Sequence, residues 1–322
     1  MTHRASACGK IILLGEHAVV YGFPAIAVPV RELRAWADFA ESRSPFRIEA
    51  PAIGLDAPLE DLPAEHPLAF CVRRSLEILH TTLPAGCLTV TSEIPVASGL
   101  GSGAAVSTAI VRVLASAAGQ TLPPEEVSRI VFEVERIYHG TPSGVDNTVI
   151  AHERPIYFRR GLEPQILAVG AAIHFLIADS GVRSETRHAV GGVRERRQAD
   201  PARYEGLFKF IGDLAEQGRE YLESGDPEML GRTMFECHGM LDAIGVTTPG
   251  LDRLVAAARG AGALGAKMSG AGLGGNVIAL VDPQRFASVE SALRDSAAVA
   301  VYRMALEPSH PPLGGTEPLP AA

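Results

Sequence analysis

The stretch Pro95-Val-Ala-Ser-Gly-Leu-Gly-Ser-Gly-Ala-Ala105 does most to decide the fold of this 322-residue chain. It follows residues 88–94, which alternate like a strand, and it runs into Ser102–Ala117, where apolar residues recur at helical spacing. Glycines between a strand and a helix let backbone N–H groups approach phosphate oxygens, and the helix dipole attracts the anion. The stretch indicates a phosphate-binding loop, while a tight turn that only packs a helix against a sheet fits the same residues.

Two glycine tracts also match the dinucleotide-binding pattern. GxGxxA occurs within Gly99–Ala104 and GxGxxG within Gly270–Gly275. No βαβ unit begins the chain, and no acid follows the first tract at the spacing of about 20 residues that a ribose contact needs. The second tract runs into a strand-like segment instead of a helix. A Rossmann domain is therefore disfavoured, and the absence of GxxxxGK[ST] excludes a Walker loop.

Length and composition predict a two-domain α+β protein. At about 150 residues per domain, 322 residues make two domains, which we place at 1–165 and 166–307. Residues 308–322 are rich in Pro and Gly, and we expect a disordered tail there. The net charge of −8, from 29 basic and 37 acidic residues, argues against a nucleic-acid partner.

Periodicity and turn residues predict the order of elements along the chain. Residues 42–66 read as an irregular excursion, and residues 140–147 as a loop. Strands are expected over 7–14, 18–30, 88–94 and 173–178, on both sides of the glycine tract within 263–281, and at the end of the chain up to residue 306. Helices are expected over 68–80, 102–117 and 124–138, in a segment up to 197, over 203–223, 227–244 and 249–260, and before the last strand.

Cysteine usage and the absence of a signal predict a cytoplasmic protein. The four cysteines form no CxxC pair and have no histidine at zinc-finger spacing, so reduced thiols are expected at Cys8, Cys71, Cys87 and Cys237. The first ten residues lack the apolar region of a secretory signal. Residues 94–111 carry no charge, but Pro95, several glycines and hydroxyl residues make them a poor membrane span, so no membrane partner is expected.

Three charged residues stand where chemistry could use them. Lys10 lies inside an apolar strand and needs either an acid or a phosphate as its partner, unless it snorkels to an edge. Glu135 lies on a predicted helix, where a solvated carboxylate is the ordinary outcome. Asp146 lies in the loop after that helix, where an Asx turn or a helix N-cap is a common use of aspartate.

Taken together, the motifs resemble the GHMP kinase superfamily, and the N-terminal motif resembles the mevalonate kinases in particular. That motif is Gly9-Lys10 followed by Gly-Glu-His-Ala-Val-Val-Tyr-Gly from Gly15 to Gly22. The family phosphate loop matches Pro95–Ala105, with Gly103 where a second serine is expected, and the third motif matches Lys267–Gly275. Pro142–Asn147 also fits, with Glu135 eleven residues before Asp146. Order and spacing cover residues 8 to about 281.

The resemblance implies a fold and a reaction. The fold would be the two-domain GHMP kinase fold, with an N-terminal domain like domain 2 of ribosomal protein S5 and a ferredoxin-like C-terminal domain. The reaction would be the transfer of the γ-phosphoryl group of ATP to the 5-hydroxyl of mevalonate with Mg²⁺, a step of isoprenoid precursor synthesis. A homodimer is compatible with the family.

The resemblance also implies a role for individual residues. Asp146 would accept or orient the hydroxyl proton, and Lys10 would steady the developing charge. Glu135 and Ser102 would hold Mg²⁺. The phosphates of ATP would be bound by Pro95, Val96, Ala97, Ser98, Gly99, Leu100, Gly101, Ser102, Gly103 and Ala104. Mevalonate would be bound by Glu16, His17, Thr247, Thr248, Ser269, Gly270 and Ala271, although the two threonines serve equally well as helix N-caps.

Several alternatives share these motifs. Phosphomevalonate kinase and homoserine kinase use the same chemistry on another acceptor, and a metabolite sensor of the same fold would bind without turnover. Five arginines crowd one predicted helix region, where a solvated face is the usual outcome, but Arg183 and Arg187 could also cover a phosphate. Lys10 with Glu16-His17 speaks against a mevalonate-diphosphate decarboxylase, and the presence of both Lys10 and Asp146 speaks against a sensor.

Overall fold

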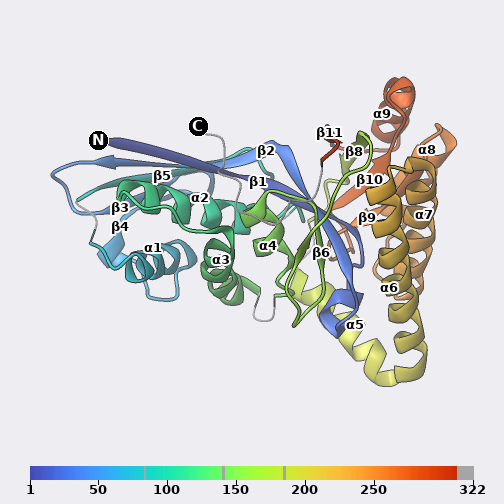
Figure 1. Ribbon diagram of the computed structural model, residues 1–322, viewed down its shortest axis with the longest axis horizontal. Helices are drawn as coiled ribbons and strands as arrows, with labels where there is room; N and C mark the ends of the chain where they lie inside the picture. Colours follow the sequence, from blue (N-terminus) through green and yellow to red (C-terminus); the bar gives the residue numbers. More distant parts are fainter. Residues whose placement is uncertain (83–84, 97, 140–141, 184–185, 310–322) are drawn as a thin grey trace.

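The computed structural model describes residues 1–82, 85–96, 98–139, 142–183 and 186–309. Within them the chain builds two sheets, each covered by helices, that meet near the middle of an elongated molecule (Figure 1). The α+β class and the two-domain GHMP kinase fold are both confirmed.

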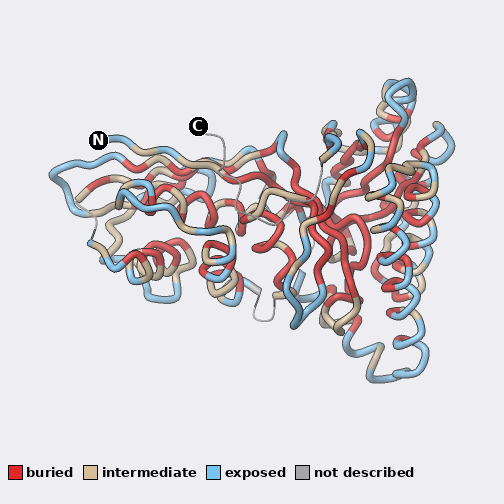
Figure 2. The backbone as a smooth tube through the Cα atoms, in the orientation of Figure 1, coloured by how far each residue is buried: buried red, intermediate tan, exposed pale blue. Residues whose placement is uncertain are grey.

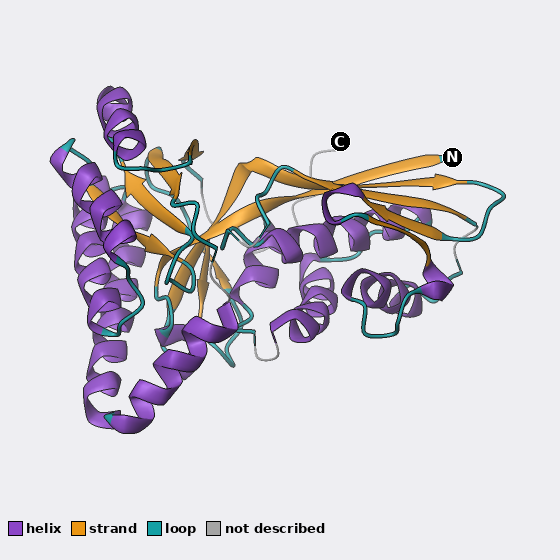
Figure 3. Cartoon of the chain, turned by 180° about the vertical axis from the view of Figure 1, so that it is seen from behind, coloured by secondary structure: helices purple, strands orange, loops and turns teal. Residues whose placement is uncertain are grey.

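The first sheet is built around the long hairpin of β1 (Thr2–Leu14) and β2 (Ala25–Glu41), which pair antiparallel. Its strand order is β4-β3-β5-β2-β6-β7, with β1 paired to β2 off this path. Its other strands are β3 (Arg47–Ala50), β4 (Leu55–Pro58), β5 (Gly86–Ser92), β6 (Ile156–Phe158) and β7 (Gln165–Ile166). One face is covered by α1 (Pro67–Ile78), α2 (Ser102–Ala117), α3 (Pro124–His139) and α4 (Val145–His152) (Figure 3).

The second sheet is antiparallel throughout, in the order β11-β8-β10-β9. Its strands are β8 (Ile173–Asp179), β9 (Gly265–Ser269), β10 (Asn276–Leu280) and β11 (Ala300–Leu306). The helices of this half are α5 (Thr186–Ala199), α6 (Pro201–Ser224), α7 (Pro227–Ala243), α8 (Pro249–Gly260) and α9 (Phe286–Asp295). The helices α6 and α7 form a long antiparallel pair at one end of the molecule (Figure 1).

One continuous core joins the two halves. Its buried apolar residues run from β1 and β2 into β8, β9 and β10 without a break (Figure 2). The end of β1 contacts β9, α6 and α7, so the first strand of the chain reaches the second sheet. This junction carries the site described below.

Local sequence explains where three consecutive helices begin. An aspartate or threonine followed by proline precedes each of them, and in each case the side chain accepts a hydrogen bond from a backbone N–H of the first turn. Proline at the first helical position loses no hydrogen bond, because that N–H has no partner inside the helix. The capping residues are Asp200 for α6, Asp226 for α7 and Thr248 for α8.

Three predicted segments are corrected. The strand expected over 18–30 is replaced at its start by a 3₁₀ turn, η1 (Ala18–Tyr21), and β2 continues to Glu41. Residues 42–66 contain β3 and β4 with two further 3₁₀ turns, because the short strands extend the sheet edge beside β5. The loop expected over 140–147 gives way to α4 at Val145. The other predicted helices and strands are present, with ends shifted by a few residues.

Other predictions concern the domain boundary, the tail, the thiols and the membrane. The boundary expected at residue 165 falls within β7, which pairs with β6 in the first sheet. Ser309 pairs with Val169, whereas the rest of the predicted tail, 310–322, lies outside the described residues. All four cysteines are free thiols. Among the described residues, no helix combines the length and the apolar character needed to cross a bilayer.

Candidate active site

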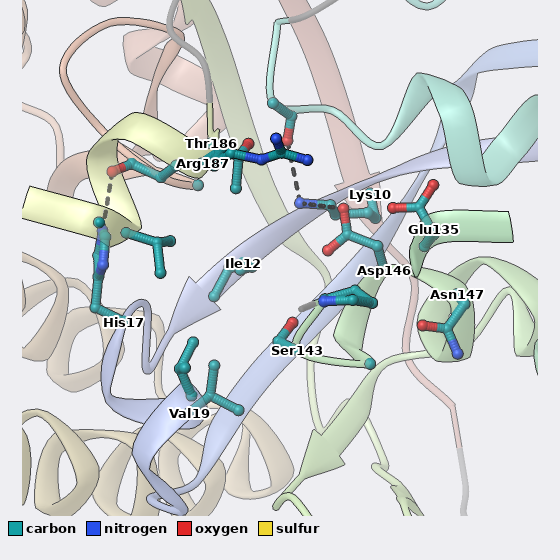
Figure 4. Close-up of a pocket in the computed structure, with 18 of the residues that line it drawn as sticks. Lys10, Ile12, His17, Val19, Glu135, Ser143, Asp146, Asn147, Thr186 and Arg187 are labelled. Atoms are coloured by element: carbon teal, nitrogen blue, oxygen red, sulfur yellow. Dashed lines mark hydrogen bonds and ion pairs between the residues drawn. The ribbon is translucent and has the colours of Figure 1, made fainter. Parts of the chain in front are cut away.

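A cavity of about 370 Å³ lies where the two halves of the chain meet (Figure 4). Its walls come from β1, from η1 and the segment before it, and from the first and second glycine tracts. The last turns of α3, the start of α4 with the residues before it, and α5 complete them. Seven of the site residues predicted from sequence line this cavity, namely Lys10, His17, Gly99, Glu135 and Asp146, with Gly270 and Ala271 from the second glycine tract.

Lys10 is the centre of this arrangement. Its side chain is almost completely buried, and its Nζ lies 3.1 Å from Asp146 Oδ2 and donates a hydrogen bond of 3.1 Å to the carbonyl of Gly99. The backbone N–H of Lys10 donates to the carbonyl of Leu100 at 2.9 Å. A buried ammonium needs such compensation, because an unpaired charge is costly in the protein interior. The acid partner predicted from the strand pattern is therefore present, and the snorkelling alternative is wrong.

The first glycine tract forms the turn between β5 and α2. Gly101 precedes α2 with φ of 76°, a left-handed conformation that glycine adopts without strain. Among the described residues of the tract, only Gly99 lines the cavity. Ala97 lies outside the described residues. The other predicted phosphate ligands do not line the cavity, namely Pro95, Val96, Ser98, Leu100, Gly101, Ser102, Gly103 and Ala104.

Asp146 lies in the first turn of α4, with its carboxylate directed at Lys10 (Figure 4). The N-cap of α4 is Gly144, at φ of 94°, and no side chain caps the helix. The N-cap role considered for Asp146 is therefore wrong. A negative charge in the first turn of a helix interacts well with the helix dipole, and Asp146 is the acidic residue of that turn.

Both ends of α4 are fixed to its neighbours. Near the beginning, Asn147 Nδ2 donates to Ser128 Oγ on α3 at 2.8 Å. After the end, Glu153 Oε1 accepts from Arg34 Nη2 at 3.0 Å and from Arg112 Nη1 at 2.6 Å. These contacts restrain the helix that carries Asp146, which is the kind of support a catalytic group requires.

Glu135 projects from α3 toward the same point (Figure 4). Its side chain is only 4% exposed, so the solvated-face alternative is wrong. Burial raises the pKa of Glu135 to about 8, the negative charge of Asp146 adds to this rise, and Lys10 opposes it. A side chain on Gly103 would place its Cβ 3.3 Å from Glu135 Oε1. Gly103 and Glu135 therefore face each other, as the family resemblance implies for the two positions around the metal.

Glu16 and His17 are neighbours in sequence, but only His17 lines the cavity. Glu16 is completely buried and forms an ion pair with the equally buried Lys267. Burial raises the pKa of Glu16, while the charge of Lys267 opposes the rise. His17 lines the cavity, and its Nε2 lies 2.9 Å from the carbonyl oxygen of Ala271 (Figure 4).

The His17 ring is neutral at physiological pH. Burial lowers the pKa of His17 to about 4. A carbonyl oxygen can only accept, so Nε2 carries the proton that it donates to Ala271. Nδ1 is then left as a hydrogen-bond acceptor.

The remaining predicted substrate residues are placed differently. Gly270 and Ala271 line the cavity, but Ser269 Oγ is occupied by the backbone of Ile12. Thr248 caps α8, as the alternative held, and Thr247 Oγ1 donates to Asp242 Oδ1 at 2.8 Å. Neither threonine lines the cavity.

Two features of the site were not predicted from the sequence, namely most of the cavity wall formed by α5 and the buried ion pair of Glu16 with Lys267. The helix α5 contributes Thr186, Arg187, Val190, Gly191 and Arg194. The sequence predicts Arg187 as a cover for a phosphate, whereas the solvated face predicted for Arg194 is wrong, because Arg194 lines the cavity. Figure 4 shows Arg187 extending toward Lys10. The partner of Glu16 was missed as well, although Lys267 also stands inside an apolar strand, the signal that applied to Lys10.

The charges suit a negatively charged reactant and a hydroxyl group that must be activated. Lys10, Arg187 and Arg194 place three cationic side chains on the walls of the cavity, which also carry the acids Asp146 and Glu135. Within the described part of the chain, no group of three or more His, Cys, Asp or Glu side chains could hold a metal by itself. A metal here would need oxygen ligands from a bound phosphate.

Comparison with known proteins agrees with this site. The family model for the GHMP kinases N terminal domain matches residues 69–153, and the model for the GHMP kinases C terminal domain matches residues 219–299. Together they include Asp146, Glu135 and both glycine tracts.

Individual relatives extend the similarity over nearly the whole chain. A mevalonate kinase of Thermococcus gammatolerans is 35% identical over 312 residues, which cover 90% of this chain and 92% of the relative. A mevalonate kinase of Pyrococcus horikoshii is 35% identical over 313 residues, with 90% and 91% covered. The crystal structure of L. major mevalonate kinase with R-mevalonate has a TM-score of 0.82 and 26% identity, and covers 95% of this chain and 96% of that one. From its motifs, its two domains and these relatives, the chain belongs to the GHMP kinase family.

Proposed function

We propose that this protein transfers the γ-phosphoryl group of ATP to the 5-hydroxyl of mevalonate. The observation that carries the proposal is the ion pair of Lys10 and Asp146 inside the cavity, beside Gly99. Phosphoryl transfer depends on alignment and charge stabilisation more than on covalent help from the protein. The identity of the acceptor is inferred from the curated relatives, which are mevalonate kinases.

Each catalytic role follows from position and charge. Asp146 accepts or orients the proton of the attacking hydroxyl, and Lys10 lowers the cost of the charge that develops on that oxygen. The N–H groups at the start of α2, together with Ser102, bind the phosphates of ATP through the partial positive charge of the helix end. Arg187 adds a cation from the opposite wall.

The acceptor binds at the end of the cavity formed by His17, Gly270 and Ala271. The unprotonated Nδ1 of His17 accepts a hydrogen bond from a hydroxyl of the acceptor. Thr247 and Thr248 are left out of this site, since their hydroxyls serve Asp242 and the first turn of α8.

The residues present fit Mg²⁺ bound together with ATP. Mg²⁺ prefers oxygen ligands and is usually held by one or two carboxylates plus substrate phosphates. The raised pKa of Glu135, about 8, reflects a buried carboxylate beside a second acid, and a nearby cation would offset the cost of ionising it. Glu135 and Ser102 would hold the ion, which would neutralise charge on the phosphates of ATP. Gly103 offers no hydroxyl for this purpose.

The alternatives considered from sequence are less well supported. Phosphomevalonate and homoserine would need the same catalytic pair, but the curated relatives name neither as substrate. A sensor without turnover would have no need for the ion pair of Lys10 and Asp146.

The proposal includes the setting of the enzyme. Its partners are ATP and mevalonate, with no nucleic acid or membrane component, and it works in the cytoplasm, where free thiols such as Cys87 stay reduced. The proposal includes assembly into a homodimer. Sedimentation velocity tests it by measuring whether the protein has the mass of one chain or of two. We also propose the division into domains 1–165 and 166–307, with the boundary inside β7 at the edge of the first sheet.

A coupled assay of ADP release tests the function. Mevalonate, phosphomevalonate and homoserine are compared at equal concentration with the purified full chain, and Asp146→Asn measures contaminating ATPase activity. We expect turnover with mevalonate alone. ADP release that does not depend on mevalonate, or that prefers another acceptor, would contradict the proposal.

A further inference from the structure

Lys267, Ser269 and Ala271 form a seam between the two halves of the molecule. One residue lies between each of them and the next, so within β9 the side chains of Lys267 and Ser269 point to the same face of the second sheet. This face is turned to the end of β1 and to the segment that leads into η1. Each of the three residues contacts that segment.

The side-chain contacts of the seam are buried. Lys267 Nζ pairs with the carboxylate of Glu16 and also donates to the carbonyl of Met268 at 2.7 Å, and both charged side chains have an exposed fraction of 0%. Ser269 Oγ donates to the carbonyl of Ile12 at 2.9 Å and accepts from the N–H of Ile12 at 3.1 Å. This hydroxyl therefore donates its only proton inside the seam and has none to donate to a substrate.

The third contact holds a residue in an uncommon conformation. His17 has φ of 60°, a left-handed region that residues with a side chain rarely adopt and that the surrounding structure must support. The support comes from both sides. The carbonyl of Ala271 fixes the ring, and the preceding residue, Glu16, is tied to Lys267.

We propose that Lys267, Glu16 and Ser269 are positioning residues that hold His17 in place at the acceptor end of the cavity. The strand β1 belongs to the first sheet and β9 to the second, so this end of the cavity is complete only when the two halves are docked through the seam. Glu16 and Ser269 then act on the acceptor through His17 and the backbone, without touching it. The inference rests on the proposed function for the identity of the acceptor.

Steady-state kinetics of four variants test the positioning role. Lys267→Met removes the cation, Glu16→Gln with Lys267→Met removes both charges, and Ser269→Ala removes the second contact. Lys209→Met is the matched control, because Lys209 forms an exposed ion pair with Asp213 on the surface of α6. We expect the first three variants to raise KM for mevalonate by roughly 3- to 10-fold, the range for one lost hydrogen bond, with KM for ATP unchanged. The control should leave both constants unchanged.

The double variant separates positioning from stability. Lys267→Met leaves a buried carboxylate without its partner, so it should be the least stable variant, and the double variant should recover part of that loss. The double variant should nevertheless keep the raised KM for mevalonate. A double variant with wild-type KM, or equal increases of KM for both substrates, would overturn the proposal. If Lys267→Met does not fold, the double variant and Ser269→Ala still decide it.

A readout that needs no acceptor separates this inference from the proposed function. The ¹⁵N chemical shifts of the His17 ring, assigned with His17→Ala, should show the Nε2–H tautomer in the wild-type protein. In the double variant we expect a mixture of tautomers and a titration midpoint nearer to that of free histidine. An unchanged ring signal would overturn the positioning role even if mevalonate is the substrate. A changed signal in a protein inactive on mevalonate would refute only the proposed function.

Discussion

The ammonium of Lys10 lies 3.1 Å from the carboxylate of Asp146 while it donates to the carbonyl of Gly99, also at 3.1 Å. One buried cation thus connects β1 with the turn between β5 and α2 and with the helix α4. Because Lys10 is already held by its backbone in β1, the pair is organised before any substrate binds. Preorganised charge of this kind is usually the largest contribution to catalysis.

Replacement of Asp146 by asparagine should lower kcat by about 10²- to 10⁴-fold, the range for loss of a general base, with little change in KM for ATP. The reason is that Asn keeps the size of the side chain but cannot accept the proton. Asp213→Asn on the surface of α6 is the matched control. Near wild-type turnover in Asp146→Asn would show that Asp146 is not the base.

Replacement of Lys10 by methionine should also lower kcat by orders of magnitude while ATP binding largely survives. The 2.9 Å backbone bond from Lys10 to Leu100 remains in this variant, so the turn before α2 should keep its shape. Isothermal titration with a nonhydrolysable ATP analogue measures the binding. A loss of ATP affinity as large as the loss of kcat would assign Lys10 to nucleotide binding.

His17→Ala should raise KM for mevalonate by roughly 3- to 10-fold, as expected for one lost hydrogen bond, and leave KM for ATP nearly unchanged. His3→Ala, at a half-buried position that does not line the cavity, serves as the control. Initial-rate measurements with each substrate varied in turn give both constants. An equal rise in both would make His17 a structural residue.

The Mg²⁺ requirement should depend on the residues around Gly103. We expect Glu135→Gln to raise the Mg²⁺ concentration for half-maximal activity by roughly 10-fold or more, and Ser102→Ala to raise it less. Gly103→Ser should lower the requirement, because its hydroxyl would extend from a Cβ that lies 3.3 Å from Glu135 Oε1. Activity against Mg²⁺ concentration measures all three. An unchanged requirement in Glu135→Gln would refute this metal site.

The free energy of unfolding should decrease as the pH rises from 6.5 to 8, because of the raised pKa of Glu135 in the folded protein. Its pKa is raised from 4.5 to about 8 in the folded protein, so the folded form retains a proton that the unfolded form has lost. The free energy of unfolding then decreases with rising pH by up to about 1.4 kcal/mol per pH unit. His17, whose pKa is lowered to about 4, acts in the opposite sense only below about pH 6.5.

Urea unfolding at several pH values tests this dependence. Glu135→Gln should flatten the decline above pH 6.5, whereas Glu236→Gln at an exposed position is the control. A decline of the same slope in Glu135→Gln and in the wild-type protein would show that another group is responsible.

Much of the architecture followed from short-range patterns in the sequence. Helix α2 has the predicted bounds, Ser102–Ala117, because apolar spacing and the glycines before it act within a few residues. The start of α8 was open to prediction for the same reason, since Thr248 and Pro249 form a local cap. The order and spacing of the glycine tracts, Lys10 and Asp146 can be seen in the sequence itself, so these site residues could be predicted without a structure.

The contacts of the buried polar side chains depend on how segments that are distant in the sequence pack together. Glu16 and Lys267 are separated by 251 residues, and nothing in the sequence near Glu16 indicates that its carboxylate is buried against a lysine of the second sheet. The motif predicts Ser269 as a substrate ligand, but in the structure its hydroxyl donates to the backbone carbonyl of Ile12. Local periodicity specifies each element, but a buried charge or hydroxyl takes whichever partner the packing of two sheets brings to it, because the cost of leaving it unpaired is paid only in the folded interior.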